Sequence, residues 1–193
     1  MNKSLRIASI LLAASLLGGC AAAVVGGAAT GVAVGHDRRT TGTFIEDKEI
    51  LIRAMSMRSD DSEITQNSDI DITVYNMQVL LTGQAQSVAL VERLKGQIET
   101  IPRVRRVINE VGIGAQATVG ENTSDAYLTA RVKVALFDVK IDGFNTTRVK
   151  VTTSQGTVYL MGLLSREEAD AATEVVRYVS GVKRVVKLFE YVD

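Results

Sequence analysis

The chain repeats itself, and this duplication limits the folds that are open to it. Residues 70–73, 79–83 and 104–108 recur in the same order as residues 149–152, 158–162 and 182–186, and Asp47 and Ser87 correspond to Asp125 and Ser165. A repeat of about 78 residues is too long for a solenoid unit and indicates a duplicated small domain. The sequence therefore predicts two tandem domains, 43–114 and 124–193, joined by a linker over 115–123.

Both copies predict the same order of elements, α-β-β-α-β. An amphipathic helix opens each copy, and its N-terminal cap is expected within residues 43–46 in the first copy and 122–124 in the second. The second helix begins at Ser87 or Ser165, and Pro102 or Gly181 follows its end. Its apolar stripe has helical spacing in both copies. The stripe consists of Val91, Leu94, Ile98 and Ile101 in the first copy and Ala169, Ala172, Val176 and Val179 in the second.

Two strands separate the helices, and a third strand ends each copy. The first strand alternates in polarity, with Ile70 and Ile72 on one face and Asp69 and Asp71 on the other. This alternation predicts that helices cover one face of each sheet while the other face meets water. The expected fold class is α+β, with two helices on one face of each three-stranded sheet. The second copy carries Arg148 and Lys150 where the first carries Asp69 and Asp71, so the outward faces are either a docking pair or simply solvated.

The N-terminus has the form of an export signal. Lys3 and Arg6 precede an apolar run over residues 7–17 that is too short to span a bilayer, and Leu-Gly-Gly-Cys then ends at Cys20. This ending resembles a bacterial lipobox, so we expect residues 1–19 to be a lipoprotein signal peptide and Cys20 to be lipidated. Ala21 resembles the pattern that sorts lipoproteins to the outer membrane, facing the periplasm. The alternative is an ordinary secretory signal with a chance cysteine.

Composition excludes several classes of protein. Residues 20–42 are rich in Ala and Gly, which favours a flexible tether over a glycine-rich helix on the bilayer. The chain has 22 basic and 22 acidic residues, so nucleic acid is not an expected partner. Cys20 is the only cysteine, and its lipidation leaves no disulfide, no thiol catalysis and no cysteine-based metal site.

The sequence contains no motif that indicates catalysis. His36, the only histidine, lies in the predicted tether without a partner at the spacing of a metal site or a catalytic dyad. Residues 60–63 are an acidic cluster that lacks the glycine and the regular ligands of a calcium loop, so a solvated loop is expected there. No glycine-rich segment leads into Lys-Ser or Lys-Thr as a phosphate loop does. We therefore expect a protein that is not an enzyme and that needs no cofactor or metal.

Several short motifs coincide in both copies. The opening helices contain Asp-x-x-Ile at Asp47 and Asp-x-x-Leu at Asp125, the strand pairs end in Leu-x-Gly at Gly83 and Gly162, and each last strand begins with Val-x-x-Val. In this order the motifs resemble the BON domain, and two such domains behind a lipobox resemble the dual BON-domain lipoproteins of outer membranes. The resemblance implies phospholipid binding, a role in outer-membrane integrity and an association with the division site.

The opening helix of the second copy is the candidate site. At about 100° per residue, Leu128, Val132, Ala135 and Leu136 share one side and are expected to pack on the sheet. The other side is also apolar and is flanked by cations, which suits an anionic lipid surface of phosphatidylglycerol or cardiolipin. The predicted lipid-binding residues are Tyr127, Ala130, Arg131, Lys133, Val134, Phe137 and Lys140.

Two alternatives to direct lipid contact stay open. The first is that Tyr127, Val134 and Phe137 pack against the first domain within one compact body. The second is a protein-interaction scaffold that modulates outer-membrane assembly proteins through the first domain or an exposed sheet edge. The corresponding helix of the first copy has a weaker and partly acidic surface, which includes Lys48, Glu49 and Ile52.

Overall fold

The computed structural model describes residues 37–192, which belong to one compact unit. The predicted signal peptide, Cys20, His36 and most of the predicted tether lie outside the described residues. The first domain contains α3 (Thr41–Asp60), α4 (Ser62–Asn67), β1 (Ser68–Tyr75), β2 (Gln78–Ala85), α5 (Val88–Glu99), β3 (Arg106–Asn109) and β4 (Gly112–Ile113). The second contains α6 (Val119–Ala135), the 3-10 turns η2 (Leu136–Asp138) and η3 (Thr146–Arg148), β5 (Val149–Ser154), β6 (Thr157–Leu164), α7 (Arg166–Arg177) and β7 (Arg184–Tyr191). The α+β class and the repeated order are confirmed.

The two sheets have the same topology. β1 pairs antiparallel with β2, β2 pairs parallel with β3, and β4 extends the edge of β2 by a short parallel pairing. β5, β6 and β7 repeat this arrangement, and Val79↔Val107 in the first sheet corresponds to Val158↔Val185 in the second. The parallel pairs follow from the helical crossover, because α5 or α7 carries the chain back before the last strand.

Helices cover the outer face of each sheet and form two separate cores. In the first domain, Leu94 and Ile98 of α5 pack with Ile50 and Ala54 of α3 over the sheet. In the second domain, the core contains Leu128 and Val132 of α6 together with the α7 stripe residues. These residues lie where the helical periodicity places them.

One aspartate of the repeated motif holds the β-hairpin of each domain. Asp47 accepts hydrogen bonds from the backbone N–H groups of Asn76 and Met77, at 2.8 and 2.7 Å, and Asp125 binds the equivalent pair in the second domain. Asn76 and Met77 have φ of 50° and 61°, as a type I′ turn requires. The Asp-x-x-Ile motif therefore fixes the helix to the hairpin.

The glycine of the Leu-x-Gly motif has a steric role. A Cβ at Gly83 would lie 1.9 Å from the carbonyl oxygen of Asp69, and at Gly162 it would lie 2.6 Å from that of Arg148. Only glycine allows the antiparallel partner strand to approach this closely.

Several predicted boundaries are wrong, and each has a local cause. Thr40 caps α3 by accepting the N–H of Thr43, so the helix begins within the segment predicted to be tether. Thr118 caps α6 through a capping box with Glu121, so the predicted cap at 122–124 lies inside the helix. The acidic cluster at 60–63 is not a loop, because Asp61 caps the short helix α4 with its carboxylate.

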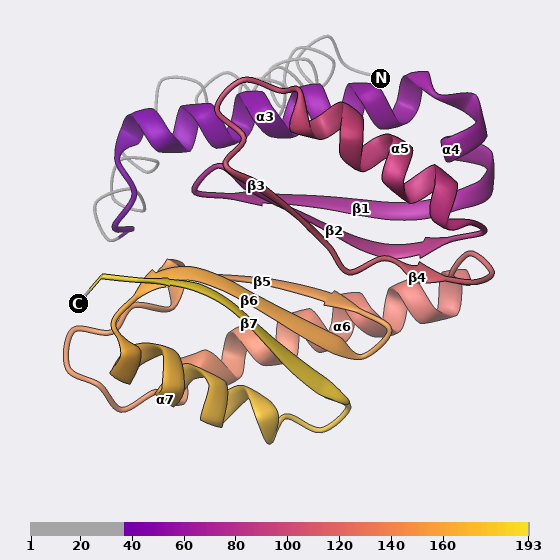
Figure 1. The fold of residues 1–193 in the computed structure, drawn as a ribbon. Coiled ribbons are helices and arrows are strands. Elements are labelled where there is room, and N and C mark those ends of the chain that lie inside the picture. Colours follow the sequence, from indigo (N-terminus) through magenta and orange to yellow (C-terminus); the bar gives the residue numbers. More distant parts are fainter. Residues whose placement is uncertain (1–36, 193) are drawn as a thin grey trace, which may run out of the picture. The chain divides into compact units, whose positions relative to one another are not determined.

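The prediction of one solvated face per sheet is also wrong. Figure 1 shows the two sheets facing each other, with α3 and α5 on the outer side of one and α6 and α7 on the outer side of the other. Tyr75 and Leu80 of the first sheet and Tyr159 and Met161 of the second are buried in one shared cluster. β6 is an almost continuous apolar run, and β2 is buried along nearly its whole length around the apolar residues Val79, Leu80 and Leu81, which is the pattern of strands buried on both faces.

Candidate functional site

The helix α6, together with the turn η2 that continues it, has one face buried in the core and a second apolar face that is exposed. Its inward residues Leu128, Val132 and Leu136 are 6, 0 and 1% exposed, since they belong to the core of the second domain. Tyr127, Val134 and Phe137 point away from that core, because they are 66, 69 and 72% exposed. Large apolar side chains that no described residue covers form a continuous surface along one helix face.

The remaining predicted site residues flank this surface. Ala130, Lys133 and Lys140 are exposed. Arg131 is half-buried, donates from Nη1 to the carbonyl oxygen of Ser180 at 2.9 Å, and holds its guanidinium 5.8 Å from the centre of the Tyr127 ring. The structure therefore brings the apolar residues and cations to one helix, with Lys140 beyond its end.

The alternative in which this face packs on the first domain does not hold. The contact that α6 makes with the first domain comes from its first turns, where Asn122 donates to the carboxylate of Asp69 at 3.1 Å. The exposed fractions of Tyr127, Val134 and Phe137 leave these side chains away from the interdomain interface.

The electrostatic surroundings of α6 are basic on the side of Lys133. Burial lowers the pKa of the Lys150 amine, and the charges of Lys48, Lys133 and Arg39 lower it further, against the opposing effect of Asp47. Lys133 is therefore one of the positive charges around Lys150.

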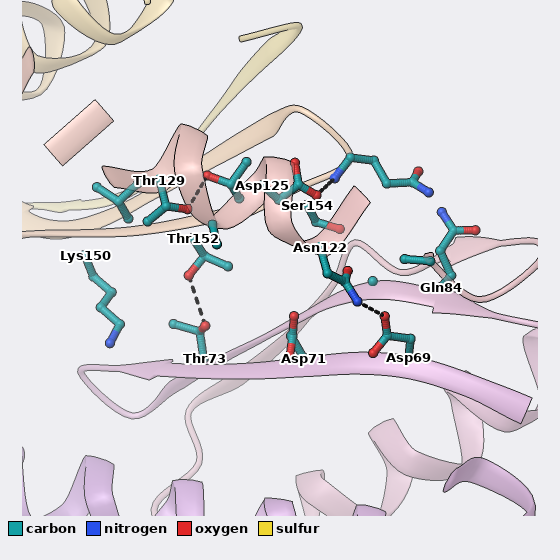
Figure 2. A pocket seen from close by; sticks show the side chains of 16 residues that line it. Asp69, Asp71, Thr73, Gln84, Asn122, Asp125, Thr129, Lys150, Thr152 and Ser154 are labelled. Atoms are coloured by element: carbon teal, nitrogen blue, oxygen red, sulfur yellow. Dashed lines mark hydrogen bonds between the residues drawn. The ribbon is translucent and has the colours of Figure 1, made fainter. Parts of the chain in front are cut away.

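A polar hollow of about 470 Å³ lies where the two sheets meet near α6 (Figure 2). Thr73 and Thr152 share a hydrogen bond of 3.0 Å across it. Asp71 and Lys150 line it but do not form an ion pair with each other, and burial, followed by the charge of Asp69, raises the pKa of Asp71. Of the two alternatives left open for the outward faces, the structure shows docking rather than solvation, but apolar residues and the threonine pair make the contact rather than the opposite charges.

The segment before α3 forms contacts that the sequence reading missed. Arg39 lies 3.9 Å over the ring of Tyr75 and pairs through Nη1 with Asp47 at 2.6 Å. The same guanidinium also donates to the carboxylate of Asp37. Burial alone would raise the pKa of Asp37, but the hydrogen bonds from Arg39 outweigh it, so the pKa is lowered. Burial, with the charge of Asp37, raises the pKa of Tyr75 to about 12. Arg39 thus ties this segment to the first domain.

The neighbouring Arg38 ties the same segment to the second domain. It donates to the carbonyl oxygen of Leu163 at 3.1 Å and pairs with Glu168, which is 4% exposed. Burial would raise the pKa of Glu168, but Arg38, the backbone of Ser165 and Arg148 lower it overall. We call residues 37–39 the interdomain strap. The prediction that residues 20–42 form a flexible tether is therefore wrong for the strap. Arg38 and Arg39 fix it by pairing with carboxylates of both domains.

Neither a metal centre nor a spanning helix is found in the part of the chain that the structure describes. Among residues 37–192 there is no group of three His, Cys, Asp or Glu side chains placed to hold a metal. Within the same residues, every helix is too short or too polar to cross a bilayer.

Comparisons with known proteins show what the chain is similar to. The BON domain family matches residues 57–115 and 124–193. Outer membrane lipoprotein DolP of Haemophilus influenzae is 34% identical over 189 residues, which cover 97% of this chain and 96% of that protein. A 21 kDa hemolysin of Actinobacillus pleuropneumoniae is 35% identical over 160 residues, with coverage of 81 and 80%. The solved structure of CdsD, a structural protein of the type III secretion system of Chlamydia trachomatis, aligns over 75% of this chain and 94% of its own at 9% identity and a TM-score of 0.30.

Proposed function

The chain belongs to the BON domain family and is a dual-BON outer-membrane lipoprotein, and from this premise we propose that it binds anionic phospholipid through α6. It acts without catalysis and supports the integrity of the outer membrane, with the division site as its place of action. Its partners are the anionic phospholipids phosphatidylglycerol and cardiolipin.

One observation carries the proposal: three large apolar side chains are exposed on a helix whose opposite face is already buried. Tyr127, Val134 and Phe137 are each about two-thirds exposed or more, and they make no contribution to the core of the domain. Burying such side chains at an interface contributes a few kcal/mol at about 25 cal/mol per Å². Lys133, Arg131 and Lys140 each add on the order of 1 kcal/mol at an anionic surface.

With a lipid anchor on the chain, a weak contact between α6 and the membrane is sufficient for binding. We propose that Cys20 carries the acyl chains, palmitate included, so that the protein is already held at its membrane. The protein then meets lipid head groups at a high effective concentration, and α6 needs only modest affinity to dock. Replacement of Cys20 with Ser is expected to leave the chain uncleaved or unlipidated, and a wild-type mass without acyl chains contradicts the assignment.

The proposal is tested with a chain that lacks residues 1–20, so that binding does not depend on the anchor. Wild type is expected to bind phosphatidylglycerol or cardiolipin micelles better than zwitterionic micelles in an NMR titration. The double replacement of Tyr127→Glu and Phe137→Glu is expected to weaken this binding more than tenfold, because it removes apolar burial and adds negative charge. The melting temperature should change little, since both side chains lie outside the core.

A further variant separates the two contributions. Lys133→Glu is expected to weaken binding in low salt and to have less effect in high salt, because exposed charges are screened. If wild type binds no anionic micelle, phospholipid binding is wrong. If the double variant binds as wild type does, binding occurs but α6 does not carry it.

Protein binding by the first domain is the second candidate function. The outward side of α3 exposes Ile45, Ile52 and Met55, which are 62, 67 and 48% accessible. Such a stripe suits an apolar partner surface and gives a place for an outer-membrane assembly protein. We expect cross-linking from position 55 to a membrane-assembly protein, and we expect Ile52→Glu to abolish it.

A further inference from the structure

A second element reaches the outward face of α6. An open cleft of about 570 Å³ lies between α6 and the end of α7, two neighbouring helices of the second domain (Figure 1). Tyr127 and Arg131 line it from α6, and Tyr178 and Ser180 line it from the residues that follow α7. The exposed surface is therefore wider than a single helix face.

Tyr178 has no role in the core. The inward stripe of α7 consists of Ala169, Ala172 and Val176, all fully buried, whereas Tyr178 is 71% exposed. The guanidinium of Arg177 lies 4.9 Å from the centre of its ring. A tyrosine has an apolar body and a polar tip, so it is suited to the boundary between head groups and acyl chains.

Arg131 joins the two walls of the cleft. Its Nη1 donates to the carbonyl oxygen of Ser180, and its guanidinium lies beside the ring of Tyr127. A guanidinium has five N–H donors, so further donors can face a phosphate. Asp138 also lines the cleft and offers an acceptor for a head-group hydroxyl, while Glu174 pairs with Arg177 at 2.9 Å.

We propose that Tyr178 enters the bilayer interface together with Tyr127, and that the cleft between them faces the phosphodiester head group of an anionic phospholipid. This inference rests on the proposed function of α6 and adds a second binding element to it. The occupant of the cleft is a membrane, because the cleft continues the exposed apolar surface of α6, Arg131 lines it, and Arg177 lies beside the ring of Tyr178.

The chain contains no tryptophan, which permits a direct test. The full-length protein, extracted with its anchor, is reconstituted into vesicles of phosphatidylcholine alone or of phosphatidylcholine with phosphatidylglycerol. Tyr178→Trp is expected to emit at shorter wavelength in the vesicles with phosphatidylglycerol and to be quenched there by brominated acyl chains. Tyr127→Trp should show the same shift. Tyr191→Trp is the matched control, since Tyr191 is also exposed beneath an arginine, Arg166, but lies on β7.

The outcomes separate this inference from the proposed function. A shift at position 127 without a shift at 178 overturns the two-element surface and leaves α6 as the lipid contact. No shift at either position overturns both. Tyr178→Glu is expected to lower the vesicle affinity of the chain lacking residues 1–20 about tenfold, with Tyr178→Phe close to wild type. An unchanged affinity of Tyr178→Glu, at the stability of wild type, also counts against Tyr178.

Discussion

The opening helices α3 and α6 occupy the same place in the two domains but present different surfaces. On α3 the exposed Ile45 and Ile52 stand among paired charges, such as Glu49 with Arg53 at 2.7 Å. On α6 and η2 the exposed apolar side chains include Tyr127 and Phe137, which are 66 and 72% exposed, and the guanidinium of Arg131 lies beside the Tyr127 ring. The duplication thus kept the frame of the fold and changed the outward helix face, which is free to vary because the core does not use it.

The retained aspartates also differ in what they support. Asp47 holds the hairpin of the first domain and is the buried partner of Arg39 in the interdomain strap, whereas Asp125 holds the hairpin of the second. The same motif residue therefore has an additional task in the first domain.

The largest expected effect is the loss of stability when Asp47 is replaced, compared with the loss at Asp125. Asp47→Ala removes two hairpin hydrogen bonds and one of the two carboxylate partners of the buried Arg39 guanidinium, so we expect a loss of about 3 kcal/mol or more in the free energy of unfolding. Asp125→Ala removes only hairpin hydrogen bonds and should cost about 1–2 kcal/mol. Urea unfolding of both variants measures the difference. Equal losses, or a larger loss at Asp125, contradict the additional role of Asp47.

An intermediate effect concerns the pH dependence of the strap. The pKa values of Asp37 and Glu168 are lowered in the folded state, so their stabilising contribution is present above their unfolded pKa values, near 4, and is lost as the pH falls through the folded values. We expect the unfolding free energy to decrease from about pH 5 downward, with uptake of up to about two protons at these sites. Arg38→Ala should make the decrease shallower, because it removes the main partner of Glu168. An unchanged acid dependence in that variant contradicts the assignment.

The frame of each domain follows from the sequence because local patterns determine it. The duplication, the helical stripes, the capping box at Ser165 and the turn at residues 155–156 all lie where short-range rules place them. The inward and outward sides of α6 were also predictable, since about 100° per residue places Leu128 and Val132 on one side and Tyr127 and Phe137 on another.

The contact between the domains was not predicted, because the alternation of β1 was given more weight than the apolar run of β6 and the three consecutive apolar residues of β2. Leu80, Tyr159 and Met161 are buried on the face expected to be wet. Continuous apolar runs in central strands are the signal that could have indicated this burial. The strap and Tyr178 depend on residues that are distant in sequence, and such contacts leave no periodic pattern to detect.

The smallest expected effect sharpens the comparison between the two helix faces. Replacing both Ile45 and Ile52 with Glu adds two negative charges and removes apolar surface from α3, as the Glu replacements at Tyr127 and Phe137 do on α6. If lipid binding belongs to α6, the α3 variant should bind phosphatidylglycerol micelles within about twofold of wild type, which is less than 0.5 kcal/mol. Its unfolding free energy should also stay within about 0.5 kcal/mol, since both residues are more than 60% exposed. The same NMR titration measures the affinity. A loss as large as that of the α6 variant contradicts the assignment of lipid binding to one domain, because α3 and α6 cover opposite sides of the paired sheets (Figure 1) and the membrane contact then involves both helices.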